Sequence, residues 1–482
     1  MILILVGAIA LSAVAIYNGY PFFFFDTHAY YTGGEKSLGA VLDLACNAGL
    51  GCGGAAAGDP IQGDVSVGSD DAAARPGASG TTSTGRSPFY GIFVYLAAHE
   101  ASIWLIVVAQ ALLASWLLYL TCRLVLGEAS SLGFLGTVVV VAALSSAPFF
   151  VGYLMPDIFA GLYILAMAVL ITFRERLTWI ELIGLCALLV CSMLFHRSHV
   201  LTAALLLGLV GLFVLIFERS QLRRLAPSLA LIGAAVGIGA IGFVALDLAV
   251  TKMTGRLATP PPFLLARVIE DGPGTSYLKD ACGEEGYVVC RFVDRMPISE
   301  HDFLWSKEAG AGVWYVVSPE ERTQIAREQY EIVLRSFLHD PLTQIGAIAG
   351  NFGQQLIDFS LASFAADDLL KSFVAESFGG EQADRFLRSR IAGDGLHLHT
   401  LSVLYYLVVG GAFLLLLLRF RTLDPALRTL VAIVFAGIVL NALVTGSIST
   451  PFPRFQARVI WLVPALAAIV ELRRLLRRPA PA

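Results

Sequence analysis

Apolar runs of bilayer-spanning length recur along this chain, separated by short segments rich in charged residues. A lipid-exposed backbone must satisfy its hydrogen bonds internally, so such runs are expected to fold as α-helices that cross the membrane. The sequence therefore predicts an all-α polytopic membrane protein with about ten transmembrane helices. The runs lie at residues 1–17, 103–125, 132–150, 158–173, 178–195, 200–217, 225–250, 401–418, 430–445 and 459–472.

The composition also favours a membrane protein. Of the 482 residues, 57% are hydrophobic and 15% are charged, whereas soluble domains carry about 25% charged residues. The first run lacks a basic n-region, which predicts that it is retained as a span and not removed as a signal peptide. The formal net charge of -4 provides no basic surface for nucleic acid, so no nucleic-acid partner is expected.

Arginines in the short loops set the expected orientation. Because such residues concentrate on the cytoplasmic side, these loops and both chain termini are predicted to be cytoplasmic. The loops between them, including 18–102 and 251–400, are then predicted to lie outside. The arginines are Arg123, Arg174, Arg176, Arg219, Arg223, Arg224, Arg419, Arg421, Arg428, Arg473, Arg474, Arg477 and Arg478.

Three parts are expected along the chain. Residues 1–250 form an N-terminal transmembrane half that contains the outer loop 18–102. Residues 251–400 form a small, mainly helical extracytoplasmic domain before the last three spans, which occupy 401–482. Within the outer loop, 47–85 is rich in small and polar residues and has almost no large apolar ones, so this segment is expected to be flexible.

Four cysteines fall in the predicted outer segments, in two closely spaced pairs. Cys46 and Cys52 lie in the first outer loop, and Cys282 and Cys290 lie in the 251–400 domain. In an oxidising compartment such pairs favour two local disulfides. The alternative is four free thiols. The cysteine spacings do not resemble a zinc site.

Two carboxylates are candidates for chemistry at the outer surface. Asp26 follows four phenylalanines directly after the first span, where partial loss of solvation favours a role as general base. An interfacial aromatic anchor with a helix-capping aspartate explains the same residues. Asp157 follows Pro156 at the start of a span, and a simple helix start explains it equally well.

Basic residues gather on the same predicted side. His196, Arg197 and His199 join two spans, and Arg454 and Arg458 lie one helical turn apart before the last span. With Arg86 of the first outer loop and His28 beside Asp26, they suit an anion such as phosphate, because guanidinium offers a forked set of donors. Polar turns and snorkelling to lipid headgroups are the alternatives.

Taken in order, these features resemble the polytopic GT-C glycosyltransferases, which use polyprenyl-phosphate-linked sugars. The resemblance covers most of 1–217 and the last spans, and two features depart from it. His28 stands where many members carry a second acid, and the 47–85 insertion is unusual. The matching elements are Asp26, Arg86-Ser87-Pro88, Pro156-Asp157, His196-Arg197-Ser198, His339-Asp340-Pro341 and Arg454-Phe455.

The resemblance implies an enzyme of the bacterial inner membrane with its active face in the periplasm. Its donor would be a polyprenyl-phosphate-linked sugar, and its acceptor an envelope glycan, lipid or protein. Asp26 would act as the catalytic base, and Asp157 would be a second catalytic residue that orients the acceptor or a donor hydroxyl. The residues that would bind the substrate and its phosphate are His28, Arg86, His196, Arg197, His199, Arg454 and Arg458. No cofactor and no metal site is expected, although a role for a divalent ion stays open.

Three other classes remain open at this point. A lipid or polysaccharide transporter or flippase would place ionisable residues deep inside its spans. An O-antigen polymerase-like or ligase-like envelope enzyme would use the same outer residues with a different donor. A non-catalytic membrane assembly protein would tolerate loss of Asp26 and Arg454.

Overall fold

The computed structural model describes the whole chain except residues 48–85, 255–257, 259, 379, 394 and 477–482. The described residues are helical and contain no strand, apart from an isolated bridge between Phe22 and Tyr153. The expected flexible segment 47–85 and the expected Cys46–Cys52 disulfide depend on residues outside the described ranges.

Six helical stretches of the described chain are long and apolar enough to cross a membrane: Trp104–Leu144, Ile158–Arg176, Arg197–Phe217, Arg219–Lys252, Leu398–Thr422 and Pro425–Ile448. The first of these is a pair of helices, α5 (Trp104–Leu126) and α6 (Ser130–Leu144), which pack against each other and are joined by η1 (Gly127–Ala129). Shorter apolar helices cover Ile2–Leu11 and Trp179–Phe195. The chain is thus an all-α membrane protein.

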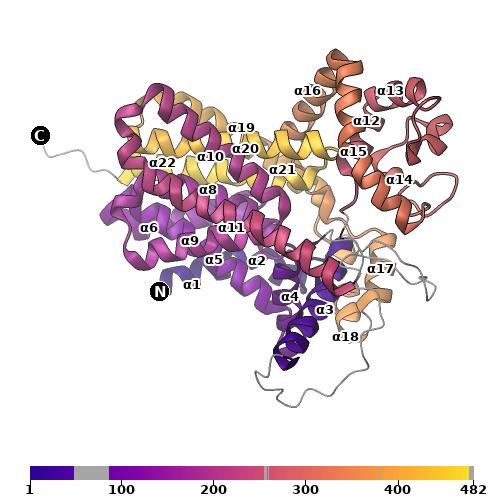
Figure 1. The fold of residues 1–482 in the computed structure, drawn as a ribbon. Helices are drawn as coiled ribbons and strands as arrows, with labels where there is room; N and C mark the ends of the chain where they lie inside the picture. The colour runs from indigo at the N-terminus through magenta and orange to yellow at the C-terminus, as the bar shows by residue number, and fades with distance from the viewer. Residues whose placement is uncertain (48–85, 255–257, 259, 379, 394, 477–482) are drawn as a thin grey trace, which may run out of the picture.

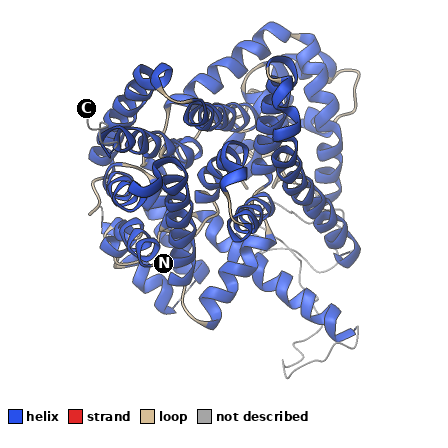
Figure 2. Ribbon diagram, turned by 90° about the vertical axis from the view of Figure 1, so that its left-hand side faces the viewer, coloured by secondary structure: helices blue, strands red, loops and turns tan. Residues whose placement is uncertain are grey.

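These helices lie alongside one another in one bundle (Figure 1). Figure 2 shows several of them end-on. The bundle is centred on α8, which is buried along almost its whole length. Besides α5, α6 and α8 (Ile158–Phe173), its members are α1 (Ile2–Leu11), α2 (Ala13–Asn18), α7 (Ala147–Val151), η2 (Arg174–Arg176), α9 (Trp179–Phe195), α10 (Arg197–Phe217), η3 (Arg219–Gln221), α11 (Leu222–Thr254), α19 (Leu398–Arg419), η7 (Phe420–Thr422), α20 (Pro425–Ile448), α21 (Pro453–Ile460) and α22 (Leu462–Leu476).

Three of the expected spans contain a local break. The first run divides at Ser12, whose hydroxyl donates to the Ala8 carbonyl. The run 132–150 divides into α6 and α7 at Ser145, which ends α6 in an extended conformation. The last run divides between α21 and α22, ahead of Pro464. Polar hydroxyls and proline compete with the helical hydrogen-bond ladder, so hydropathy alone does not reveal these breaks.

Two helices extend from one end of the bundle. They are α3 (Phe25–Asn47) and α4 (Pro88–Glu100), which pack side by side. A Cβ atom on Gly34 would lie 2.0 Å from the carbonyl oxygen of Gly91, so the two backbones touch where only glycine fits. Two helices from later in the chain, α17 (Asp368–Phe378) and α18 (Gly380–Leu387), lie in the same region, and α17 packs against α3 (Figure 1).

The expected 251–400 domain has two parts. A lobe at 263–339 has its own hydrophobic core and a disulfide between Cys282 and Cys290, the pairing expected from the sequence. From Phe359 onward, buried residues belong instead to the core of the bundle. The lobe contains α12 (Phe263–Glu270), α13 (Pro273–Ala281), η4 (Val288–Arg295), α14 (Glu300–Trp305) and α15 (Pro319–His339), and the second part contains α16 (Pro341–Ile357), η5 (Ala362–Phe364), α17, α18 and η6 (Ile391–Gly393).

Candidate functional site

The first turn of α3 and the start of α4 bring an acid and a base together. Asp26 lies in the first turn of α3, and Arg86 comes just before α4. The Nη2 atom of Arg86 lies 2.5 Å from Oδ1 of Asp26. The close backbone contact between Gly34 and Gly91 fixes the two helices and therefore this pair.

A second carboxylate begins α8. Asp157 occupies the N-cap position, yet its side chain makes no capping hydrogen bond. It faces α21, where Nη1 of Arg458 lies 3.4 Å and Nε of Arg454 lies 3.7 Å from its Oδ1 atom. The one-turn spacing of the two arginines aims both at this carboxylate. Helix capping therefore does not explain why the Asp157 carboxylate is directed toward the two arginines.

Arg454 connects the two carboxylates. Its Nη2 atom lies 3.8 Å from Oδ2 of Asp26, and Nη1 donates to the Tyr153 hydroxyl at 3.5 Å. Its guanidinium carbon lies 4.2 Å from the centre of the Phe24 ring and 5.4 Å from that of Phe455. Aromatic faces attract cations and exclude water, so the third of the four phenylalanines before Asp26 helps to hold Arg454.

Arg458 is fixed by a different set of contacts. Its Nη2 atom donates to Oδ1 of Asn441 on α20 at 3.1 Å, and the amide of Asn441 donates to the Phe455 carbonyl at 2.6 Å. Asn441 therefore joins α20 to α21 and orients Arg458. Asn441 and Tyr153 are not among the site residues predicted from the sequence.

The five ionisable side chains form a continuous, largely buried cluster, referred to below as the charged cluster. It consists of Asp26, Arg86, Asp157, Arg454 and Arg458. The Asp157 side chain is 3% exposed and that of Asp26 is 17% exposed. Three guanidiniums face two carboxylates, so these five side chains have a formal net charge of +1. A buried charge is costly unless it is balanced, so the cluster suits an anionic ligand.

Tyr30 is a further residue of this site that the sequence analysis missed. It lies one helical turn after Asp26, and its buried hydroxyl has no hydrogen-bond partner among the described residues. Burial raises the pKa of Tyr30, which is close enough to Arg86 and Arg454 to interact with both. The hydroxyl therefore stays protonated and is available as a donor. The i, i+4 spacing from Asp26 was the sequence signal for it.

The histidines have separate environments. Nδ1 of His196 accepts from the Ser198 backbone N–H at 3.2 Å, which leaves the ring proton on Nε2. His196 interacts electrostatically with Arg86, Arg454 and Arg458 and thus borders the charged cluster. Nδ1 of His199 lies 2.8 Å from the Ser192 carbonyl, so it carries the proton, and its buried Nε2 has no partner among the described residues.

Two predicted binding residues are held by other elements. Arg197 forms an ion pair with Asp247 of α11 at 2.6 Å and lies over the Phe243 ring. His28 lies edge-on to Phe373 and Phe378 of α17. Because it is two residues from Asp26 along a helix, it occupies another face of α3. Across the described residues, no three His, Cys, Asp or Glu side chains gather as metal ligands would.

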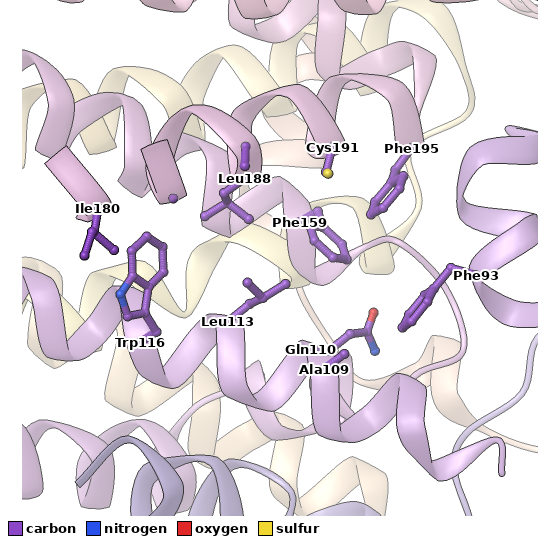
Figure 3. A pocket seen from close by; sticks show the side chains of 12 residues that line it. Phe93, Ala109, Gln110, Leu113, Trp116, Phe159, Ile180, Leu188, Cys191 and Phe195 are labelled. Carbon is purple, nitrogen blue, oxygen red and sulfur yellow. The ribbon is translucent and has the colours of Figure 1, made fainter. Parts of the chain in front are cut away.

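An apolar cavity in the bundle is separated from the charged cluster by aromatic side chains. Its volume is about 500 Å³, and its lining side chains come from α4, α5, α8 and α9 (Figure 3). Phe159 of the lining follows Asp157 by two residues, and Phe195 directly precedes His196. Tyr90 packs against both rings and against Tyr30. The lining residues are Phe93, Ala109, Gln110, Leu113, Trp116, Phe159, Ile180, Gly184, Ala187, Leu188, Cys191 and Phe195.

The segment before α21 is held from the side of the lobe. The side-chain amide of Gln355 on α16 pairs with the backbone of Phe452 through two hydrogen bonds of 3.0 and 2.9 Å. Glu300 of the lobe accepts from the Ser449 hydroxyl at 3.0 Å and from the Thr450 backbone N–H. Burial raises the pKa of Glu300. These contacts fix the chain just ahead of Arg454.

In comparisons with known proteins, no family model, no curated protein and no solved structure matches this chain. The fold and composition define it as a helical membrane protein.

Proposed function

We propose that this protein is a membrane glycosyltransferase that moves a sugar from a polyprenyl-phosphate donor to an envelope acceptor. The charged cluster, with its formal net positive charge, is the observation that carries the proposal. The apolar cavity beyond Tyr90 supports it. A lipid phosphate combines an anionic head with a long apolar chain. The cluster matches the head, and the cavity matches part of the chain.

The proposed orientation follows the arginine-rich loops. About ten helices cross the membrane, both termini lie in the cytoplasm, and the lobe and charged cluster face the periplasm. In support of this, the start of α1 and the end of α22 lie at the end of the bundle away from the lobe (Figure 1). The ion pairs Arg224–Glu175 and Arg419–Glu471 belong to the arginine-rich connections.

The proposed reaction is a single displacement with inversion at the sugar. Asp26 takes the proton from the acceptor hydroxyl as that oxygen attacks the anomeric carbon. The bond between this carbon and the phosphate oxygen breaks, and the electron pair leaves with the lipid phosphate. Arg454 and Arg458 stabilise the departing anion, for which one preorganised donor contributes about 3–4 kcal/mol.

The other cluster residues orient these groups. Arg86 holds Asp26 at 2.5 Å and fixes the direction of the base. Asp157 holds Arg454 and Arg458, so we assign it to positioning the phosphate-binding arginines. This is more specific than the role in substrate orientation that the resemblance implied.

Transfer by the purified protein in lipid nanodiscs tests the proposal. The substrates are a panel of polyprenyl-phosphate sugars together with extracted envelope acceptors, and the release of polyprenyl phosphate is measured. We expect release by the wild-type protein and by Glu308→Gln, a matched change of an exposed acid in the lobe. Asp26→Asn should remain folded and lose release. Equal release by Asp26→Asn and wild type would refute the assignment of the base.

Binding of the donor anion is tested separately. Polyprenyl phosphate without a sugar should raise the unfolding temperature of the wild-type protein and of Asp26→Asn. It should raise that of Arg454→Gln much less. An equal rise for Arg454→Gln would place the phosphate elsewhere and would favour the transporter, the polymerase-like or ligase-like enzyme, or the assembly protein.

A further inference from the structure

One corner of the lobe exposes a continuous apolar stripe. It runs along the second half of α15 and onto the start of α16, where Leu338 is 69% exposed and Leu342 is 82% exposed. The spacing on α15 of four, three and one residues places its members on one helical face. The stripe, called the α15–α16 stripe below, consists of Tyr330, Leu334, Phe337, Leu338, Leu342 and Ile345.

The lobe does not need this stripe for its own folding. The opposite face of α15 buries Ile325, Gln329, Ile332 and Ser336. Among the described residues of 263–339, every exposed large hydrophobic side chain belongs to α15. The exposure is therefore concentrated at one corner. Contiguous apolar surface of this kind marks a contact with a membrane or another protein.

The position of α16 indicates which contact this is. α16 packs along α20, one of the stretches long enough to cross a membrane. The packing is close, because a Cβ atom on Gly446 of α20 would lie 2.9 Å from the Asn351 carbonyl oxygen. Figure 1 shows α16 between the lobe and the bundle. The helix that carries Leu342 and Ile345 therefore lies against a candidate membrane span.

The side chains of the stripe also suit a lipid surface. Leu212 and Leu407 on the outside of the bundle are 56% and 70% exposed, so the stripe has the same degree of exposure as side chains on candidate spans. Tyr330 and Phe337 are aromatic residues of the kind enriched where headgroups meet acyl chains. Arg327 is exposed beside the stripe and can reach headgroups while its stem covers apolar surface.

We propose that the α15–α16 stripe rests on the lipid bilayer at the headgroup–acyl boundary. It anchors the lobe to the membrane surface next to α20. Because the lobe also holds the chain ahead of Arg454, this contact sets the height of that segment above the bilayer. The proposal does not depend on the glycosyltransferase activity.

Spin-label accessibility tests it in the full-length protein. Nitroxides are attached at Leu338→Cys and Leu342→Cys, with Glu308→Cys as the control on the lobe surface. The disulfide-forming Cys282 and Cys290 are kept. The protein is placed in vesicles of phosphatidylethanolamine and phosphatidylglycerol, after replacement of the remaining five of the seven cysteines by serine.

At the two stripe positions, relaxation by oxygen should exceed relaxation by a water-soluble nickel complex several-fold, and the order should reverse at the control. Nickel-dominated relaxation at the stripe would overturn the proposal. So would low accessibility to both reagents together with spin–spin broadening, which identifies a second copy of the chain as the occupant.

A second measurement needs no substitution. A photoreactive diazirine phospholipid in the same vesicles should label peptides covering 330–345 of the native protein as strongly as peptides of the spans. Labelling of that segment at the level of the rest of the lobe would overturn the proposal.

Discussion

Replacing Asp157 by asparagine should destabilise this protein more than replacing Asp26. The Asp157 carboxylate is 3% exposed and lies 3.4 and 3.7 Å from two buried guanidiniums. Its loss leaves both arginines without this compensation, and removal of one partner from a buried ion pair costs about 3–5 kcal/mol. Asp26 is 17% exposed, so after its substitution water can solvate part of the charge on the neighbouring arginines. We therefore expect a cost of about 1–2 kcal/mol for Asp26→Asn, within the range of ordinary substitutions.

The assay is reversible unfolding in mixed micelles at rising SDS, followed by circular dichroism. Asp157→Asn is compared with Asp26→Asn, which matches it in chemistry and differs in burial. The reasoning would be refuted if Asp157→Asn lay within about 1 kcal/mol of wild type, the average cost of a point mutation, or if the two variants ranked in the opposite order.

A double-mutant cycle separates the charge effect from the loss of packing. Arg458→Gln removes one of the two guanidiniums, so in the Asp157→Asn background it takes away a charge that no longer has its partner. The double variant should lose less stability than the sum of the single variants, by about 0.5–3 kcal/mol, the usual coupling of residues in contact. Simple additivity would show that the two side chains do not interact.

Three further changes test the site, the helix packing and the lobe. Tyr30→Phe removes a hydroxyl that has no partner among the described residues, so stability should hold or rise. The affinity for polyprenyl phosphate, measured by thermal shift, should fall about five-fold, which corresponds to the loss of one hydrogen bond of about 1 kcal/mol. Gly34→Leu forces α3 away from Gly91 and should abolish Asp26-dependent release in the transfer assay. Replacing Cys282 and Cys290 by serine removes a disulfide that closes a loop of eight residues. This change should destabilise the lobe by about 2–3 kcal/mol, and proteolysis within 263–339 should be faster.

Much of the helical framework was predictable from the sequence, because spans depend on local hydropathy. The apolar runs coincide with α5, α8, α9, α10, α11, α19 and α20. The division of the 251–400 segment was not predictable. Phe359, Phe364 and Phe386 are as apolar as the residues of the lobe core, and only the tertiary structure places them in the bundle.

The site was predictable in its residue types and less so in its pairings. Asp26, Asp157, Arg454 and Arg458 were chosen because they lie at ends of predicted spans, and the fold brings them together. Helical periodicity would have favoured Tyr30 over His28 as the neighbour of Asp26. No local pattern pairs Arg197 with Asp247, because that contact depends on how α10 packs against α11.

The unsatisfied atoms around the charged cluster argue against a purely structural role for it. Buried polar atoms in folded proteins nearly always have hydrogen-bond partners. Here the Tyr30 hydroxyl and the Nε atoms of Arg454 and Arg458 form no hydrogen bond with the described residues. A network that served only to join α3, α8 and α21 would gain stability by satisfying these donors. Donors that remain unsatisfied at a net positive site fit an anion with several oxygens. Among such anions, a lipid phosphate also has an apolar chain that suits the cavity beyond Tyr90.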